Sequence, residues 1–276
     1  MVALLVTDCS SKNEAALSLT QPAGWQTEIL MAGDFDLATM QPQGRHGQTM
    51  WIYIEGDGAA YITPSRPSSD PTPIDPVGLR LALAHPGSGP VAYVARPCQF
   101  VLPLHNRGCG KAYWTSARYS PEVIDSTNKA IDILKAEAQA TRLILVGYSG
   151  GGALAVLVAA ERHDVAGIIT VAGNLDIAYW AQRNKLSPLK NSLDPVDMAG
   201  AVATIPQVHF VGGRDDIVGP DVVQTYLKHL PANTPAWMVV MPSYTHDCCW
   251  ADKWDYLLRR TEELQYPPFN TAFTPN

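Results

Sequence analysis

Residues 142–160 constrain the fold of this chain more than any other stretch of its sequence. Residues 142–146, RLILV, form a short branched apolar run typical of a buried strand. Gly147-Tyr148-Ser149-Gly150-Gly151 follows, and residues 152–160 are an Ala/Leu/Val run without proline that predicts a helix. The glycines permit a turn so sharp that the serine is left exposed between the two elements. The segment therefore predicts a strand, a tight serine turn and a helix.

The Gly-x-Ser-x-Gly pentapeptide would be a weak signal by itself, because Gly and Ser are each roughly 7% of ordinary chains. A glycine-rich turn of this kind can also pack closely or cradle a phosphate at a helix N-terminus. The chain has no Gly-x-x-x-x-Gly-Lys-Ser/Thr run, and no Gly-x-Gly-x-x-Gly with an acidic residue about twenty positions on. The pattern therefore favours a nucleophilic serine over a phosphate loop.

Composition limits the classes of fold and of binding partner that remain for this chain. With 276 residues, of which 46% are hydrophobic and 17% charged, the chain can bury a full core as one α/β domain. A net charge of −6 with scattered Lys and Arg argues against nucleic acid as a partner. The chain contains no apolar run of roughly eighteen residues, so we expect no membrane-spanning segment.

Strand and helix patterns alternate along the chain. Strands are predicted at about 26–31, 35–40, 49–55, 90–96, 142–146, 165–171, 207–211 and 236–241, and helices at 77–84, 120–140, 152–162, 221–230 and 247–264. This order predicts a mostly parallel central sheet with an antiparallel N-terminal edge and helices on both faces. We expect an irregular segment at 1–24 and a single domain over 25–276, with a small lid-like insert near 173–204.

A serine nucleophile needs a base, and the base needs a carboxylate to orient it. In α/β sheets such groups lie at the carboxyl ends of strands. His246 comes just after the predicted strand 236–241 and is the expected base. Asp215 and Asp216 follow the strand 207–211 and are the candidate acids.

Through these three motifs in this order, residues 49–258 resemble the α/β-hydrolase superfamily of serine esterases and lipases. The acid of that family is usually the Asp of Gly-x-x-Asp-x-x-Val, which matches residues 212–218 with Asp215, so we prefer Asp215 to Asp216. The resemblance implies the α/β-hydrolase fold and hydrolysis of a small-molecule carboxylic ester by Ser149, His246 and Asp215, without a cofactor. An amidase or serine peptidase, or a catalytically silent binding protein of the same fold, are the alternatives.

The oxyanion hole of such an enzyme combines the N–H after the nucleophile, here that of Gly150, with one from the loop after the third strand. Family members often carry His-Gly-x in that loop. This chain has Glu55-Gly56-Asp57-Gly58, with glutamate in place of the histidine. The register indicates Asp57 as the second donor, and Gly58 is the alternative.

Three aromatic residues, Tyr148, Tyr179 and Trp180, are expected to line an apolar acyl pocket, although packing in the core is their alternative role. The loops at 64–76 and 98–109 are expected to shape the mouth of the cleft. Neither the choice of ester nor the oligomeric state follows from the sequence.

The five cysteines give information on the cellular compartment of the protein. The simplest pairing joins Cys98 to Cys109 and Cys248 to its neighbour Cys249. A metal site at residues 246–249 is not expected, because four consecutive residues cannot converge on one ion. Disulfides would indicate an oxidising compartment, with a periplasmic, lipid-anchored or secreted protein, and a cytoplasmic protein is the alternative.

The N-terminus, MVALLVTDCSS, resembles the end of a bacterial lipoprotein signal, in which a short apolar run leads to a lipid-bearing cysteine, here Cys9. The apolar run is shorter than a working signal region, and Asp8 stands where a small residue is expected. A frayed terminus with an incidental cysteine is the alternative.

Overall fold

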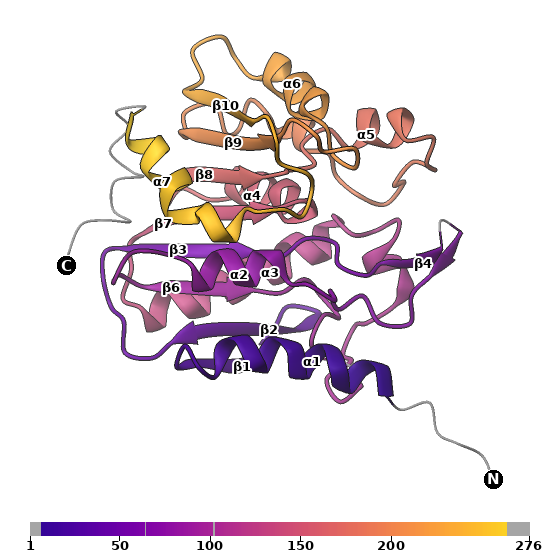
Figure 1. The fold of residues 1–276 in the computed structure, drawn as a ribbon, viewed down its shortest axis with the longest axis vertical. Helices are drawn as coiled ribbons and strands as arrows, with labels where there is room; N and C mark the ends of the chain where they lie inside the picture. Colours follow the sequence, from indigo (N-terminus) through magenta and orange to yellow (C-terminus); the bar gives the residue numbers. More distant parts are fainter. Residues whose placement is uncertain (1–6, 64, 102, 264–276) are drawn as a thin grey trace.

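The structure, a computed structural model, describes residues 7–63, 65–101 and 103–263. Its centre is an eight-stranded sheet with the order β1-β2-β6-β3-β7-β8-β9-β10 (Figure 1). The strands are β1 (Trp25–Ala32), β2 (Phe35–Pro42), β3 (Thr49–Ile54), β6 (Val91–Val94), β7 (Arg142–Tyr148), β8 (Val165–Val171), β9 (Gln207–Gly212) and β10 (Ala236–Met241). A separate hairpin pairs β4 (Tyr61–Thr63) with β5 (Arg66–Pro67).

The six strands from β6 to β10 in the sheet order run parallel, and β2 pairs antiparallel with both β1 and β6. This confirms the predicted mostly parallel sheet with an antiparallel N-terminal edge. The register sets Ile54 at the end of β3 beside Gly147 near the end of β7. The loop that follows β3 therefore emerges next to the serine turn.

Helices cover both faces of the sheet. They are α1 (Thr7–Thr20), α2 (Val77–Leu83), α3 (Pro121–Glu137), α4 (Gly150–Ala160), α5 (Ile177–Arg183), α6 (Pro220–His229) and α7 (Trp254–Glu263), with short 3-10 helices η1 (Lys111–Trp114), η2 (Pro195–Met198) and η3 (Ala251–Lys253). One core cluster contains buried side chains of α3, α4 and α6, and the other contains side chains of α1, α2 and α7. Alternate residues of β3 enter the two clusters, which is why its sequence is apolar throughout.

The expectation of an irregular N-terminal segment is wrong for residues 7–20, which form α1. The segment has no clear helical stripe, so sequence periodicity did not reveal it. Tertiary contacts hold it instead: Ala16 is buried against the core, and the Lys12 ammonium lies 3.5 Å from the Asp70 carboxylate. The part of the lipoprotein-like pattern at residues 1–6 lies outside the described residues.

The closing helix was predicted from residue 247, but α7 begins at Trp254. Residues 247–250 form a turn instead, and η3 separates this turn from α7. Among the described residues, no helix combines the length and the apolar character needed to cross a bilayer.

Candidate active site

Ser149 occupies the tight turn between β7 and α4. Its backbone has φ 52° and ψ −120°, a conformation that residues with a side chain rarely adopt. Its amide donates to the Val171 carbonyl at 2.9 Å, which fixes the turn against β8. A Cβ at Gly147 would lie 2.2 Å from the Gly151 carbonyl oxygen, and one at Gly151 would lie 2.3 Å from the Ile54 carbonyl oxygen. The glycines of the motif are therefore required by close backbone approach.

The structure brings Ser149, His246 and Asp215 together at the carboxyl ends of β7, β10 and β9. The Nε2 atom of His246 lies 3.0 Å from the Ser149 hydroxyl oxygen. The Nδ1 atom of His246 lies 2.8 Å from Oδ2 of Asp215. The Asp215 side chain is fully buried and that of His246 is 9% exposed, so the histidine–carboxylate contact is shielded from water.

The two carboxylates considered for the acid differ in environment. Asp215 is oriented by the loop after β9, because its Oδ1 accepts hydrogen bonds from the Ile217 and Val218 amides at 2.9 and 2.8 Å. Its second oxygen is left to face His246. Asp216 is exposed. The geometry therefore favours Asp215 as the partner of the histidine.

Tyr148 lies beneath the segment that carries His246. Its hydroxyl donates to the Asp247 carboxylate at 2.8 Å, and its ring centroid lies 5.4 Å from that of the histidine. Burial and the nearby Asp247 charge raise the pKa of Tyr148 far above the usual value, so this tyrosine stays a donor. The Trp250 indole N–H also donates to the His246 carbonyl, at 2.7 Å. Sequence reasoning placed Tyr148 at the substrate and gave no role to Asp247 or Trp250.

The loop after β3 lies directly beside Ser149. A Cβ built on Gly56 would be 3.2 Å from the Ser149 Cβ, and one built on Gly150 would be 2.2 Å from Oδ1 of Asp57. Gly150 is the first residue of α4, so its N–H has no carbonyl partner within the helix. Among the described residues, the Asp57 and Gly58 amides donate to no protein acceptor. Both residues therefore stay available as the second oxyanion donor.

Glu55, which stands where the resemblance leads one to expect a histidine, is buried under this loop. Its carboxyl accepts hydrogen bonds from the amides of Gly56, Gly78 and Leu79 and from the Tyr93 hydroxyl. Burial raises the pKa of Glu55, and these hydrogen bonds oppose part of that rise. Glu55 thus ties the start of the loop to the N-terminus of α2.

The side chain of Asp57 belongs to a charge cluster that sequence reasoning missed. Arg96 and Arg118 form ion pairs with it, and the Tyr119 hydroxyl donates to both of its oxygens. Burial alone would raise the pKa of Asp57, but the charges of Arg118 and Arg96 hold it below its usual value. Arg96 follows the carboxyl end of β6, so the strand-end rule could have pointed to it. Nothing in the sequence pattern pointed to Arg118.

Tyr179 and Trp180 lie on α5, and both are half-buried. The Tyr179 hydroxyl donates to the Asp221 carboxylate at 2.9 Å, and the Trp180 indole N–H donates to the Ile217 carbonyl at 2.9 Å. These bonds connect α5 to the segment that follows Asp215. The two aromatic residues therefore brace α5 against Ile217 and Asp221, which follow Asp215 in the chain.

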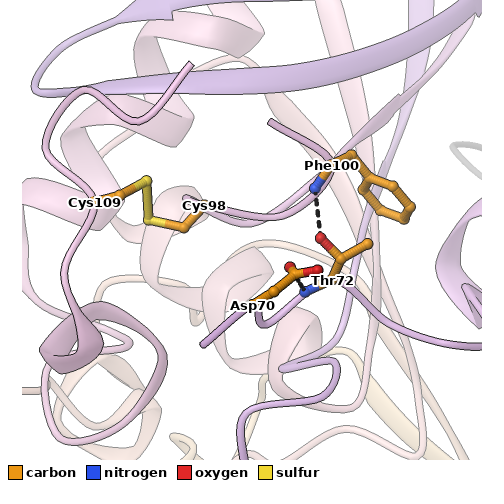
Figure 2. The surroundings of a disulfide bond; sticks show 5 residues. All are labelled: Asp70, Thr72, Cys98, Phe100 and Cys109. Carbon is orange, nitrogen blue, oxygen red and sulfur yellow. Dashed lines mark hydrogen bonds between the residues drawn. A yellow bond between two sulfur atoms is a disulfide. The ribbon is translucent and has the colours of Figure 1, made fainter. Parts of the chain in front are cut away.

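The disulfide pairings suggested by the sequence are both formed. Cys98 pairs with Cys109, and Cys248 pairs with Cys249. Figure 2 shows that the first bridge lies beside a contact between two loops, in which the Phe100 amide donates to the Thr72 hydroxyl at 2.8 Å. The loops at 98–109 and 64–76 are therefore held together.

Solved structures of similar architecture identify the fold. An esterase from Pyrococcus furiosus is 13% identical with a TM-score of 0.60, and the match covers 88% of this chain and 91% of that chain. Est1E from Butyrivibrio proteoclasticus is 13% identical with a TM-score of 0.60, covering 87% of this chain and 98% of that chain. The chain has the α/β-hydrolase fold. A membrane phospholipase A, described as a bacterial virulence factor, shares this α/β-hydrolase architecture at 13% identity and a TM-score of 0.60, over 93% of this chain and 92% of that chain.

Neither protein-family models nor curated protein sequences give a match to this chain. The likeness is therefore one of structure at low sequence identity. Within the α/β-hydrolase fold, the nucleophile sits at the top of the sheet and the triad follows the chain order serine, acid, histidine. Ser149, Asp215 and His246 have this order and this placement.

Proposed function

We propose that the protein is a serine hydrolase that cleaves small-molecule carboxylic esters through an acyl-enzyme. The observation that carries the proposal is the continuous contact from Asp215 through His246 to Ser149, with distances of 2.8 and 3.0 Å. A buried carboxylate on Nδ1 favours the tautomer in which Nε2 can accept the serine proton. The geometry required of nucleophile, base and orienting acid is thereby satisfied.

In the proposed reaction, the Ser149 oxygen attacks the ester carbonyl while His246 takes the hydroxyl proton. The resulting oxyanion accepts hydrogen bonds from the Gly150 N–H and from a second N–H in the loop after β3. The intermediate collapses, and the leaving alcohol takes the proton from His246. Water then attacks the acyl-enzyme with His246 as its base, and the acid product leaves as Ser149 regains its proton. Asp215 stabilises the imidazolium at each stage.

An ester rather than an amide substrate is supported by the names of an esterase and a phospholipase among the similar structures, which also include a puromycin hydrolase. The same triad can cleave amides, because the chemistry of acyl transfer is shared. The experiment therefore compares both classes. Purified protein is assayed on p-nitrophenyl esters of increasing chain length and on aminoacyl-p-nitroanilides. We expect hydrolysis of the esters only, and anilide hydrolysis would shift the assignment to an amidase or peptidase.

Active-site labelling tests the nucleophile directly. A fluorophosphonate probe should modify Ser149, and Ser149→Ala should abolish both labelling and ester hydrolysis. Ser18→Ala is the matched control, because Ser18 is exposed on α1. An unlabelled Ser149 in folded wild-type protein that hydrolyses no ester would overturn the function and leave a silent binding protein.

We also infer an oxidising compartment, in which the protein is periplasmic, lipid-anchored through Cys9 or secreted, because paired cysteines are rare in a reducing cytosol. The support is the Cys98–Cys109 and Cys248–Cys249 bridges. When the protein is treated with an alkylating reagent as it is extracted from its own cells, these four cysteines should stay unalkylated, because they are disulfide-bonded. A mass increase of the N-terminal peptide by acyl chains would identify Cys9 as a lipid anchor, and its absence would refute that part of the proposal.

A further inference from the structure

The position of the Asp57 carboxylate poses an electrostatic problem. Its Oδ1 lies against the Cα of Gly150, so close that a Cβ there would come within 2.2 Å of it. The Gly150 N–H is the expected donor to the oxyanion formed at Ser149. A negative carboxylate beside a developing negative charge would raise the energy of the transition state.

Two guanidinium groups compensate this charge. Arg96 Nη1 lies 2.9 Å from one Asp57 oxygen, and Arg118 Nη1 lies 2.6 Å from the other. The two arginine side chains are only 5% and 7% exposed, whereas that of Asp57 is 18% exposed. Two positive charges against one negative charge leave this cluster with a net charge of +1. The potential at the oxyanion position is therefore not dominated by the carboxylate.

The arginines are themselves held in place by the protein. Arg118 Nε donates to the Thr115 carbonyl at 2.8 Å, and Arg96 Nη2 donates to the Arg118 carbonyl. The Arg96 guanidinium also stacks over the Tyr119 ring, 5.0 Å from its centroid. Fixed and nearly buried in this way, these groups act through Asp57 and do not reach out to a substrate.

The peptide that carries the Asp57 N–H is also held from its other side. The Gln99 side-chain amide donates to the Gly56 carbonyl at 3.0 Å. In a trans peptide the carbonyl of one residue and the N–H of the next point in opposite directions. Gln99 therefore turns the Asp57 N–H away from itself. Gly58 lies on the Gln99 side, because a Cβ at Gly58 would be 2.7 Å from the Gln99 amide nitrogen.

We infer that Arg96 and Arg118 are positioning residues for ester hydrolysis. They fix Asp57 so that its N–H serves as the second oxyanion donor, and they neutralise its carboxylate. This inference rests on the proposed function and deepens it. It also selects Asp57 over Gly58 as the donor. The cluster acts on the transition state, where the oxyanion exists, and leaves binding of the planar ester almost unchanged.

The test measures kcat and KM on a p-nitrophenyl ester for Arg96→Gln and Arg118→Gln. We expect kcat to fall about 10- to 100-fold with KM within about twofold, as when an oxyanion donor is weakened. The inhibition constant of an alkyl boronic acid, which forms a tetrahedral adduct on the serine, should rise in parallel. Arg118→Lys should recover part of kcat, because it keeps the charge but not the fork of donors.

Arg162→Gln provides the matched control, because Arg162 is a similarly buried arginine bound to Asp164 and Asp132 in another part of the molecule. It should lower stability without changing kcat. If either cluster variant does not fold, Tyr119→Phe removes only the hydroxyl bound to Asp57 and should lower kcat about 3- to 10-fold at constant KM.

A double-mutant cycle distinguishes loss of charge neutralisation at Asp57 from a general loss of structure in the site. Asp57→Asn combined with Arg118→Gln should have a higher kcat than Arg118→Gln alone, because the uncompensated carboxylate is gone. Additive losses would overturn the neutralising role. Wild-type kcat in folded Arg96→Gln and Arg118→Gln would overturn the whole inference while leaving the proposed function intact. Failure of the wild type to label at Ser149 or to cleave esters would overturn the proposed function first.

Discussion

His246 places its Nε2 atom 3.0 Å from the hydroxyl oxygen of Ser149, although 97 positions separate the two residues in the chain. The contact arises because β7 and β10 end at the same edge of one parallel sheet, with β8 and β9 between them. A parallel sheet gathers the residues that follow its strands at one edge, whatever their separation in sequence.

Asp215→Asn should lower kcat by about 10⁴ while leaving the fold intact, because the histidine loses the partner that fixes its tautomer. An asparagine can still accept the bonds of Ile217 and Val218 through its one carbonyl oxygen. Steady-state kinetics with a p-nitrophenyl ester measure the effect. Asp216→Asn is the control, and a larger loss in that variant would reverse the choice of acid.

Tyr148→Phe should reduce kcat about 3- to 10-fold with little change in KM. The variant loses the hydroxyl that donates to the Asp247 carboxylate at 2.8 Å and to the His246 carbonyl at 3.4 Å, contacts that hold the His246 segment against the serine turn. Tyr256→Phe, at a half-exposed position on α7, should behave as the wild type. A rise in KM for Tyr148→Phe without loss of kcat would instead support the substrate-lining role expected from sequence.

Gly151→Ala should lower the free energy of unfolding by about 3 kcal/mol or prevent folding, because its Cβ would meet the Ile54 carbonyl oxygen at 2.3 Å. Backbone atoms of β3 cannot rotate away as a side chain could. Gly200→Ala is the matched control, since nothing lies within 4 Å of its Cβ position. Urea unfolding of both variants measures the difference, and equal stabilities would refute the steric account of the motif.

Stability at low pH should depend on Asp57. Burial raises its folded pKa, but the charges of Arg118 and Arg96, together with hydrogen bonds from Arg118 and Tyr119, bring the pKa below 3.8. The unfolded chain therefore binds this proton at higher pH than the native state does, and the stabilisation is present above pH 3.8 and lost as pH falls through the lower folded pKa. Free energies of unfolding between pH 7 and pH 2 should fall more steeply for wild type than for Asp57→Asn. Parallel curves would contradict this sign.

The two disulfides should contribute unequally to stability. The Cys98–Cys109 bridge spans 11 positions, so replacing both cysteines by alanine should lower the free energy of unfolding by about 3 kcal/mol. The Cys248–Cys249 bridge joins neighbours and restrains almost no unfolded chain, so its removal should change that free energy by under about 1 kcal/mol. Denaturant unfolding of the two double variants provides the comparison.

The sequence alone predicted the strands of the central sheet and indicated Ser149, Asp215 and His246 as the candidate catalytic residues. Each of these predictions depends on local information: strand periodicity, glycines around a turn, and the residue types that follow a strand. The strand-end rule then assembles local signals into one site without a contact map. Sequence periodicity did not predict α1, because this helix is held by tertiary contacts such as the Lys12–Asp70 ion pair.

The tertiary structure alone decided what surrounds those residues. Asp57 meets Arg96 and Arg118 across 39 and 61 positions of sequence, and no local pattern marks either arginine as its partner. Tyr148 looked like a pocket residue in the motif, yet its hydroxyl reaches Asp247 across 99 positions. Short-range sequence patterns record backbone conformation and burial, whereas the partners of a buried polar group depend on which loops the folded sheet brings together.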